Sequence, residues 1–151
     1  MHTNWSLPLP ATMAFRYSSL FDNFRDDCAA ATFEFVGTAF FLLFGLGGIQ
    51  AAADITTTGR QSSGVEQALY IATCMGMSLL VSAWLFFRVT GGLFNPNISL
   101  ALLLIGSMGP VRFVLYCVAQ LGGAIAASAL VWSLTSGPLS VKYVKPTVPN
   151  L

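Results

Sequence analysis

Residues 89–111 read VTGGLFNPNISLALLLIGSMGPV, an uncharged stretch between two arginines that decides the fold. Glycine and proline interrupt it near its start, at 91–92 and 96, and near its end, at 106–110. The longest uninterrupted piece, residues 95–107, makes about 20 Å of helix at 1.5 Å per residue. That length is short of the roughly 30 Å hydrocarbon core of a bilayer. The stretch therefore predicts a half-helix over about 95–108, which enters a membrane as a loop and returns to the same side.

The composition of the whole chain indicates a membrane protein. Of its 151 residues, 55% are apolar and only 9% are charged, and the mean hydropathy is +0.71. A soluble domain carries about 25% charged residues. Seven Lys and Arg against six Asp and Glu leave a formal charge of +1. We therefore expect the lipid bilayer as a partner and no nucleic acid.

Three further stretches are long and apolar enough to cross the bilayer as helices, namely about 29–53, 67–87 and 112–134. They are apolar on every face, whereas the strands of a membrane barrel alternate between apolar and polar residues. The predicted fold is an all-α membrane protein with three transmembrane helices and one re-entrant half-helix. A polar tail over 1–28, a polar loop over 54–66 and a C-terminal tail over 135–151 complete it.

The triplet Asn95-Pro96-Asn97 is the most informative motif. Asn is a favoured N-cap and Pro is favoured at the first helical position, while Gly92 just upstream allows a tight turn. The N-terminus of the half-helix, with roughly half a positive charge, would then point toward the membrane midplane. Such ends recur at the substrate sites of transport proteins, and an Asn amide can donate to the oxygen of water or an alcohol. The alternative is a plain helix cap in an interfacial turn, which the apolar context disfavours.

The stretch TGGLFNPNISLALLL (90–104) resembles the first signature loop of the aquaporin, or major intrinsic protein, family, whose usual form is SGGxxNPAVTL. RVTGG (88–92) is similar to a variant common in fungal members. EFVGTAFFLLFG (34–45) and YCVAQLGGAIAA (116–127) resemble the family's first and third helices, in the family's order and spacing. The resemblance covers about residues 29–134. It implies passive passage of water or small neutral solutes such as glycerol, assembly as a tetramer, no cofactor or metal, and no enzymatic activity.

The sequence departs from the family pattern in two ways. Asn97 replaces the small Ala of the usual motif, and we expect its larger polar side chain to narrow the pore or to hydrogen-bond across it. The family fold has two inverted halves, and this chain carries the motifs of the first half alone. Three hypotheses follow: the N-terminal half of a channel, a pore made of two oppositely oriented copies, or a non-conducting protein that packs against or regulates a full-length relative.

Two further residues have a predicted role at the pore. An ionisable group such as Glu34 inside a span costs about 2.5–3.5 kcal/mol and usually faces protein or water. We expect it to hold the half-helix loop through hydrogen bonds, with Thr38 and Gln120 nearby, rather than to relay protons. Met75 lies twenty residues before Asn95, where the resemblance implies a residue of the selectivity filter. A flexible Met would widen that filter; the alternative is a Met that packs in the core or faces lipid.

The distribution of basic residues predicts the orientation of the chain. By the positive-inside rule, cytoplasmic segments carry more Lys and Arg. The side of the N-terminal tail and the half-helix loop has four such residues and the opposite side has three, which favours a cytoplasmic N-terminus (Arg16, Arg25, Arg88 and Arg112 against Arg60, Lys142 and Lys145).

Overall fold

The computed structural model describes residues 23–57, 64–135 and 139, and within these ranges it contains four α-helices and no strand. The helices are α1 (Phe24–Thr57), α2 (Gly64–Thr90), α3 (Pro96–Leu104) and α4 (Pro110–Leu134). Three of them contain segments long and apolar enough to cross a membrane: Phe24–Ala53, Gly64–Thr90 and Pro110–Leu134. Helix α3 has only 9 residues. The predicted all-α fold of three long apolar helices and one half-helix is confirmed.

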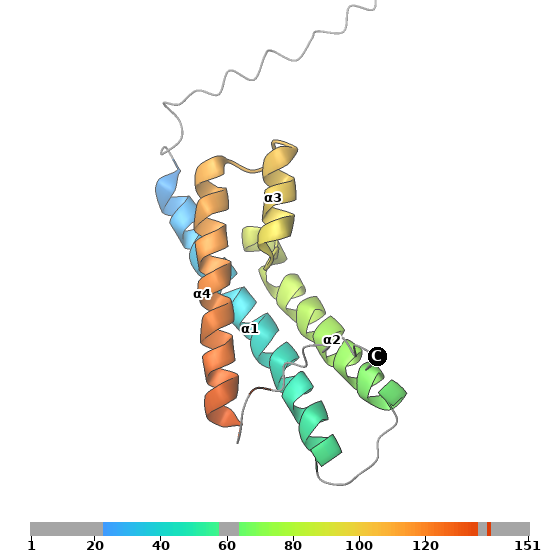
Figure 1. Cartoon of the computed structure of the whole chain (residues 1–151). Coiled ribbons are helices and arrows are strands. Elements are labelled where there is room, and N and C mark those ends of the chain that lie inside the picture. The colour runs from blue at the N-terminus through green and yellow to red at the C-terminus, as the bar shows by residue number, and fades with distance from the viewer. Residues whose placement is uncertain (1–22, 58–63, 136–138, 140–151) are drawn as a thin grey trace, which may run out of the picture.

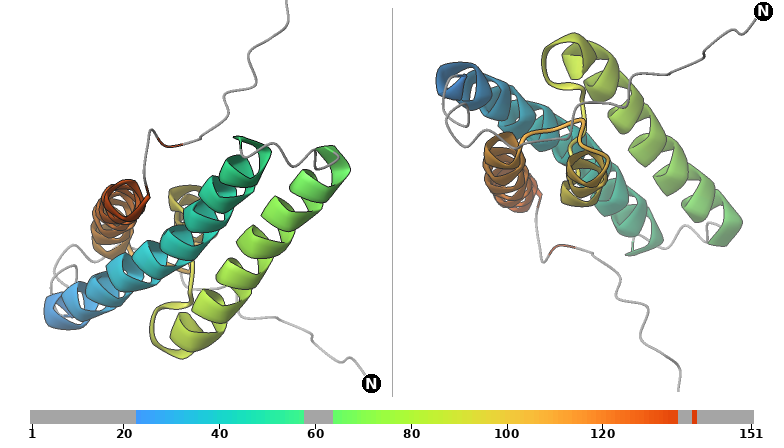
Figure 2. Two further views of the ribbon diagram at one scale, coloured as in Figure 1. Left: turned by 90° about the horizontal axis from the view of Figure 1, so that it is seen from below. Right: turned by 90° about the horizontal axis from the view of Figure 1, so that it is seen from above.

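Helices α2 and α4 both pack on α1, and the half-helix α3 packs on α4 (Figures 1 and 2). Helices α1 and α4 run side by side in the same direction, while α2 runs the opposite way along the other side of α1. Helix α3 lies in the angle between α2 and α4 and runs to the end of the bundle where α1 and α4 begin (Figure 1). Its first residues therefore lie partway along the bundle, between the two ends.

Small residues let the backbones of these helices approach closely. A Cβ added to Gly48 of α1 would lie 2.5 Å from the Cβ of Cys74 on α2. One added to Gly123 of α4 would lie 2.6 Å from the carbonyl oxygen of Phe35. Without a hydrophobic driving force between helices in lipid, such close contact supplies much of the packing energy.

The helix ends differ from the predicted ones at two places that matter for the site. Helix α1 begins at Phe24 rather than at residue 29, so the end of the predicted polar tail is helical. Asp26 and Asp27 in its first turn favour this earlier start, because carboxylates stabilise a helix N-terminus. Helix α3 ends at Leu104 rather than at 108, since the backbone turns at Gly106, whose φ is 74°.

The ends of α2 also extend beyond the predicted span 67–87, since the helix runs from Gly64 to Thr90. Residues 1–22, 58–63, 136–138 and 140–151 lie outside the described residues; they hold most of both predicted tails and the middle of the predicted polar loop.

Candidate functional site

The turn between α2 and α3 is built from residues with unusual backbone angles. Gly91 and Gly92 have φ values of 91° and 60°, which glycine adopts without strain. Phe94 has a φ of 47°, which is strained for a residue with a large side chain. Asn95 returns to an extended conformation and caps α3, because its Oδ1 accepts a hydrogen bond of 2.9 Å from the backbone N–H of Asn97. The turn thus fixes the direction in which α3 starts.

The carboxylate of Glu34, on α1, accepts four hydrogen bonds, three from this turn and one from α4. Oε1 accepts from Thr90 Oγ1 at 2.5 Å and from the Leu93 N–H at 3.1 Å. Oε2 accepts from the Phe94 N–H at 2.9 Å and from Gln120 Nε2 at 2.9 Å. Glu34 is completely buried. All four acceptor directions of the carboxylate are therefore used.

A second set of hydrogen bonds connects the turn to α4 and fixes α3. Gln120 Nε2 also donates to Ser99 Oγ at 3.1 Å, and Ser99 Oγ donates to the Asn95 carbonyl oxygen at 3.2 Å. The Tyr116 hydroxyl donates to the Thr90 carbonyl oxygen at 3.1 Å. Ser99 and Tyr116 have no exposed surface. Thr90, Ser99 and Tyr116 are site residues that the sequence pattern did not predict, although each is a polar side chain beside or within an apolar run.

Aromatic packing stabilises the strained backbone of Phe94. The Phe94 ring lies on Gly37 of α1, where an added Cβ would be 2.2 Å from Phe94 Cε1. The Phe86 ring meets it edge-on, with the centroids 6.1 Å apart and an interplanar angle of 90°. Gly37 therefore leaves the space that this ring needs.

An ion pair joins the first turns of α1 and α4. Arg112 Nε donates to Asp27 Oδ1 at 2.7 Å, with the two side chains 40% and 13% exposed. This pair lies at the end of the bundle to which α3 returns, so it joins α1 to α4, the helix on which the half-helix packs (Figure 1).

The predicted pore residues divide into exposed and buried ones. Asn95 and Asn97 are exposed at the start of α3, whereas Gln120 is buried with Glu34. Thr38 is also buried, but its Oγ1 has no hydrogen-bond partner among the described residues. The structure thus brings Glu34, Gln120 and the loop of Asn95 together.

Met75 lies apart from the Glu34 cluster, at the contact between α1 and α2. It is partly buried, and its sulfur lies 2.5 Å from where a Cβ on Gly45 would be. The thioether therefore contacts the backbone of α1, and its place in a selectivity filter stays a prediction.

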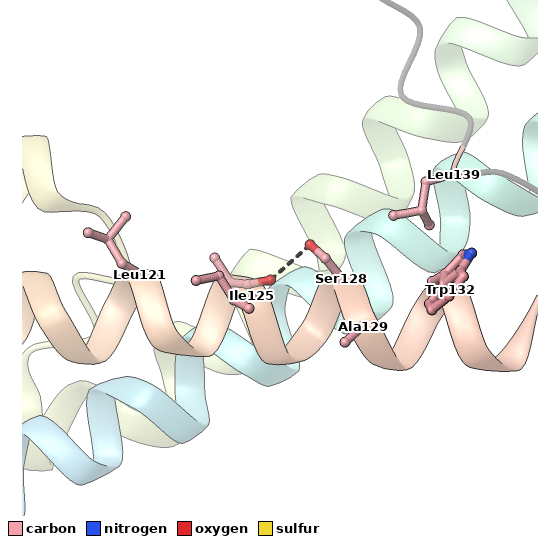
Figure 3. Close-up of a pocket in the computed structure, with 7 residues that line it drawn as sticks. Leu121, Ile125, Ser128, Ala129, Trp132 and Leu139 are labelled. Atoms are coloured by element: carbon pink, nitrogen blue, oxygen red, sulfur yellow. Dashed lines mark hydrogen bonds between the residues drawn. The ribbon is translucent and has the colours of Figure 1, made fainter.

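The outer face of α4 carries an apolar groove of about 480 Å³ (Figure 3). Its one hydroxyl, on Ser128, donates to the Ala124 carbonyl oxygen of its own helix at 2.8 Å. Apart from this hydroxyl and the indole N–H of Trp132, the side chains of the groove are apolar, so it resembles a lipid-facing surface; it is lined by Leu121, Ala124, Ile125, Ser128, Ala129, Trp132 and Leu139.

The chemistry available at the start of α3 is the donation of hydrogen bonds. Asn95 uses its Oδ1 for the cap, which leaves the Nδ2 of this exposed residue as a donor. The partial positive charge of the helix N-terminus disfavours cations there. The carboxylate of Glu34 is buried, and the four groups that donate hydrogen bonds to it compensate its charge. The arrangement suits a neutral molecule that accepts hydrogen bonds.

Comparison with known proteins gives a consistent result. The chain matches the model of the major intrinsic protein family over residues 23–150. It is 69% identical over 129 residues to an aquaporin of Laccaria bicolor and 68% identical to aquaporin-1 of the same fungus, each covering 84% of this chain. It is also 47% identical over 107 residues to aquaporin-2 of Botryotinia fuckeliana, which covers 69% of this chain. The matched part is 42% of the length of each Laccaria protein and 28% of the Botryotinia protein.

Proposed function

The chain belongs to the major intrinsic protein family, and we propose that it forms the N-terminal half of a channel that passes water and small neutral solutes such as glycerol down their gradients. It is an integral membrane protein with the fold of three long apolar helices and a half-helix. The observation that carries the proposal is the exposed Asn95 at the start of α3, held in place by the buried Glu34.

In the proposed mechanism the solute exchanges hydrogen bonds without any covalent step. A water or hydroxyl oxygen accepts a hydrogen bond from Asn95 Nδ2 as it passes. The positive end of α3 raises the energy of a cation at the same place, so neutral solutes are favoured. Asn97 adds a second amide beside Asn95 and narrows the passage, and Met75 adapts its flexible side chain to the solute.

The chain covers less than half the length of the Laccaria relatives, so we propose that conduction needs a complementary half. We further propose a cytoplasmic N-terminus, from the arginine distribution, and assembly of the completed channel into a tetramer.

The test is reconstitution of a split channel. This chain and the remaining C-terminal part of the Laccaria aquaporin are produced separately and together in vesicles, and osmotic swelling is followed by light scattering. We expect water and glycerol flux above that of either part alone. Substituting Asn95→Ala in this chain should lower that flux at equal protein content.

Each other outcome selects a different hypothesis. Flux from this chain alone would support a pore of two oppositely oriented copies. Co-purification of the two parts without flux, or of this chain with a complete channel, would support a non-conducting partner instead. Either result would overturn the proposed function.

A further inference from the structure

Two polar atoms buried between α1 and α4 have no hydrogen-bond partner among the described residues. They are the hydroxyl oxygen Oγ1 of Thr38 and the amide oxygen Oε1 of Gln120. Both residues are only 2% exposed. An unpaired polar group is costly at such a depth, and nearly all buried polar groups in folded proteins bind protein or ordered water.

The amide of Gln120 cannot be turned round to satisfy its oxygen. Both protons of Nε2 are used, one by Glu34 Oε2 at 2.9 Å and the other by Ser99 Oγ at 3.1 Å. An exchange of Oε1 and Nε2 would bring the amide oxygen against the Glu34 carboxylate. Ser99 cannot donate to Oε1 either, because its single proton goes to the Asn95 carbonyl oxygen. Oε1 therefore lacks a donor.

The hydroxyl of Thr38 lacks an acceptor for its proton. A Thr or Ser inside a helix commonly donates to the carbonyl four residues earlier. Thr32, Thr73 and Ser128 do so in this chain, at 2.9, 2.8 and 2.8 Å. Thr38 makes no such bond to the backbone carbonyl of Glu34, which is four residues earlier, so its hydroxyl is available to another group.

The two atoms belong to the same contact between parallel helices. Gln120 of α4 binds Glu34 of α1, and one turn further along both helices Gly123 meets Thr38. A Cβ on Gly123 would lie 3.1 Å from the Thr38 Cβ and 2.6 Å from the Phe35 carbonyl oxygen. Thr38, whose hydroxyl lacks an acceptor, and Gln120, whose amide oxygen lacks a donor, are thus buried within one turn of each other in the same α1–α4 contact.

We propose that one water molecule is bound between Thr38 and Gln120. The water accepts the proton of Thr38 Oγ1 and donates one of its own to Gln120 Oε1. The Phe35 carbonyl lies against Gly123 in the same contact and offers an acceptor for the second proton. Buried waters typically make two to four such bonds. This water completes the hydrogen bonds of the side chain that holds both Glu34 and the first turn of α3.

A crystal structure of the full chain, at a resolution that shows ordered waters, tests the proposal directly. We expect a water oxygen within hydrogen-bond distance of both Thr38 Oγ1 and Gln120 Oε1. A direct bond between these two atoms, or an empty space between them, would overturn the proposal. So would a side chain of a second copy in that position.

Two matched variants of Thr38, one that keeps the hydroxyl and one that removes it, give a second test. Thr38→Ser keeps the hydroxyl, so the water and the midpoint of unfolding in SDS should stay close to those of the unmodified chain. Thr38→Val keeps the shape and loses the hydroxyl, so the water should be absent and the midpoint lower. Equal midpoints for the two variants, or a water retained in the Val variant, would contradict the assigned site.

Discussion

Replacing Glu34 by Gln should destabilise the chain by loosening the turn before α3. The carboxylate accepts four hydrogen bonds, whereas a Gln side chain has one oxygen and can accept two. The NH₂ group of the new Gln, which can only donate, would face the two remaining donors. The charge that the substitution removes is already compensated by four donors, so its loss returns little free energy.

The magnitude follows from the number of bonds lost. A hydrogen bond between membrane helices contributes about 0.6 kcal/mol on average and at most about 1.7 kcal/mol, so the loss of two lowers the free energy of unfolding by about 1–3 kcal/mol. The measurement is unfolding of the chain in mixed micelles by SDS, followed by circular dichroism. Amide hydrogen exchange at Leu93 and Phe94 should also accelerate, because their N–H groups bind the two carboxylate oxygens.

Asp26→Asn is the matched control for this substitution. Asp26 lies on the same helix and is exposed, so loss of its interaction with the helix N-terminus costs about 0.3–1 kcal/mol. If Glu34→Gln costs no more than Asp26→Asn, and exchange at the two amides is unchanged, the role assigned to the carboxylate is wrong.

Three further sets of substitutions probe the turn and the helices around it by the same SDS assay. Gly37→Ala should cost about 1–3 kcal/mol, because its Cβ would overlap an aromatic ring of the turn. Gly47→Ala on the same helix has open space and should be neutral or stabilising, so equal losses would contradict this packing. Asn95→Ala should cost about 1 kcal/mol through loss of the cap, and Asn95→Ser should restore most of it; an unaffected Ala variant would refute the cap. A double-mutant cycle of Arg112→Ala with Asp27→Asn should give a coupling of about 0.2–1 kcal/mol, since Arg112 is 40% exposed; a coupling of zero would show that the pair contributes nothing.

The long helices and the half-helix could be predicted because their signals are local. Uncharged stretches of sufficient length predict spans, and the Asn95-Pro96 cap with the preceding glycines predicts where a short helix begins. The early start of α1 was missed because residues 24–28 are polar by composition. Asp27 also pairs with Arg112, a residue far along the chain, and no local pattern predicts this contact.

The residues of the site that could be predicted are also those with a local signal. Glu34 and Gln120 are noticeable as polar residues within apolar spans, so their proximity could be expected. The roles of Thr90, Ser99 and Tyr116 depend on the geometry of the turn, which brings together atoms from α2, α3 and α4. No spacing along the sequence encodes those distances.

The proposed channel requires Asn95 to lie in the path of the solute. The most direct test places a cysteine there, by Asn95→Cys, after the three native cysteines have been replaced, in vesicles that also contain the complementary half. Trp132→Cys, on the lipid-facing groove of α4, is the control. We expect a thiol reagent to block water flux in the Asn95→Cys protein and to leave it unchanged in the control. Complete labelling at position 95 with undiminished flux would contradict it.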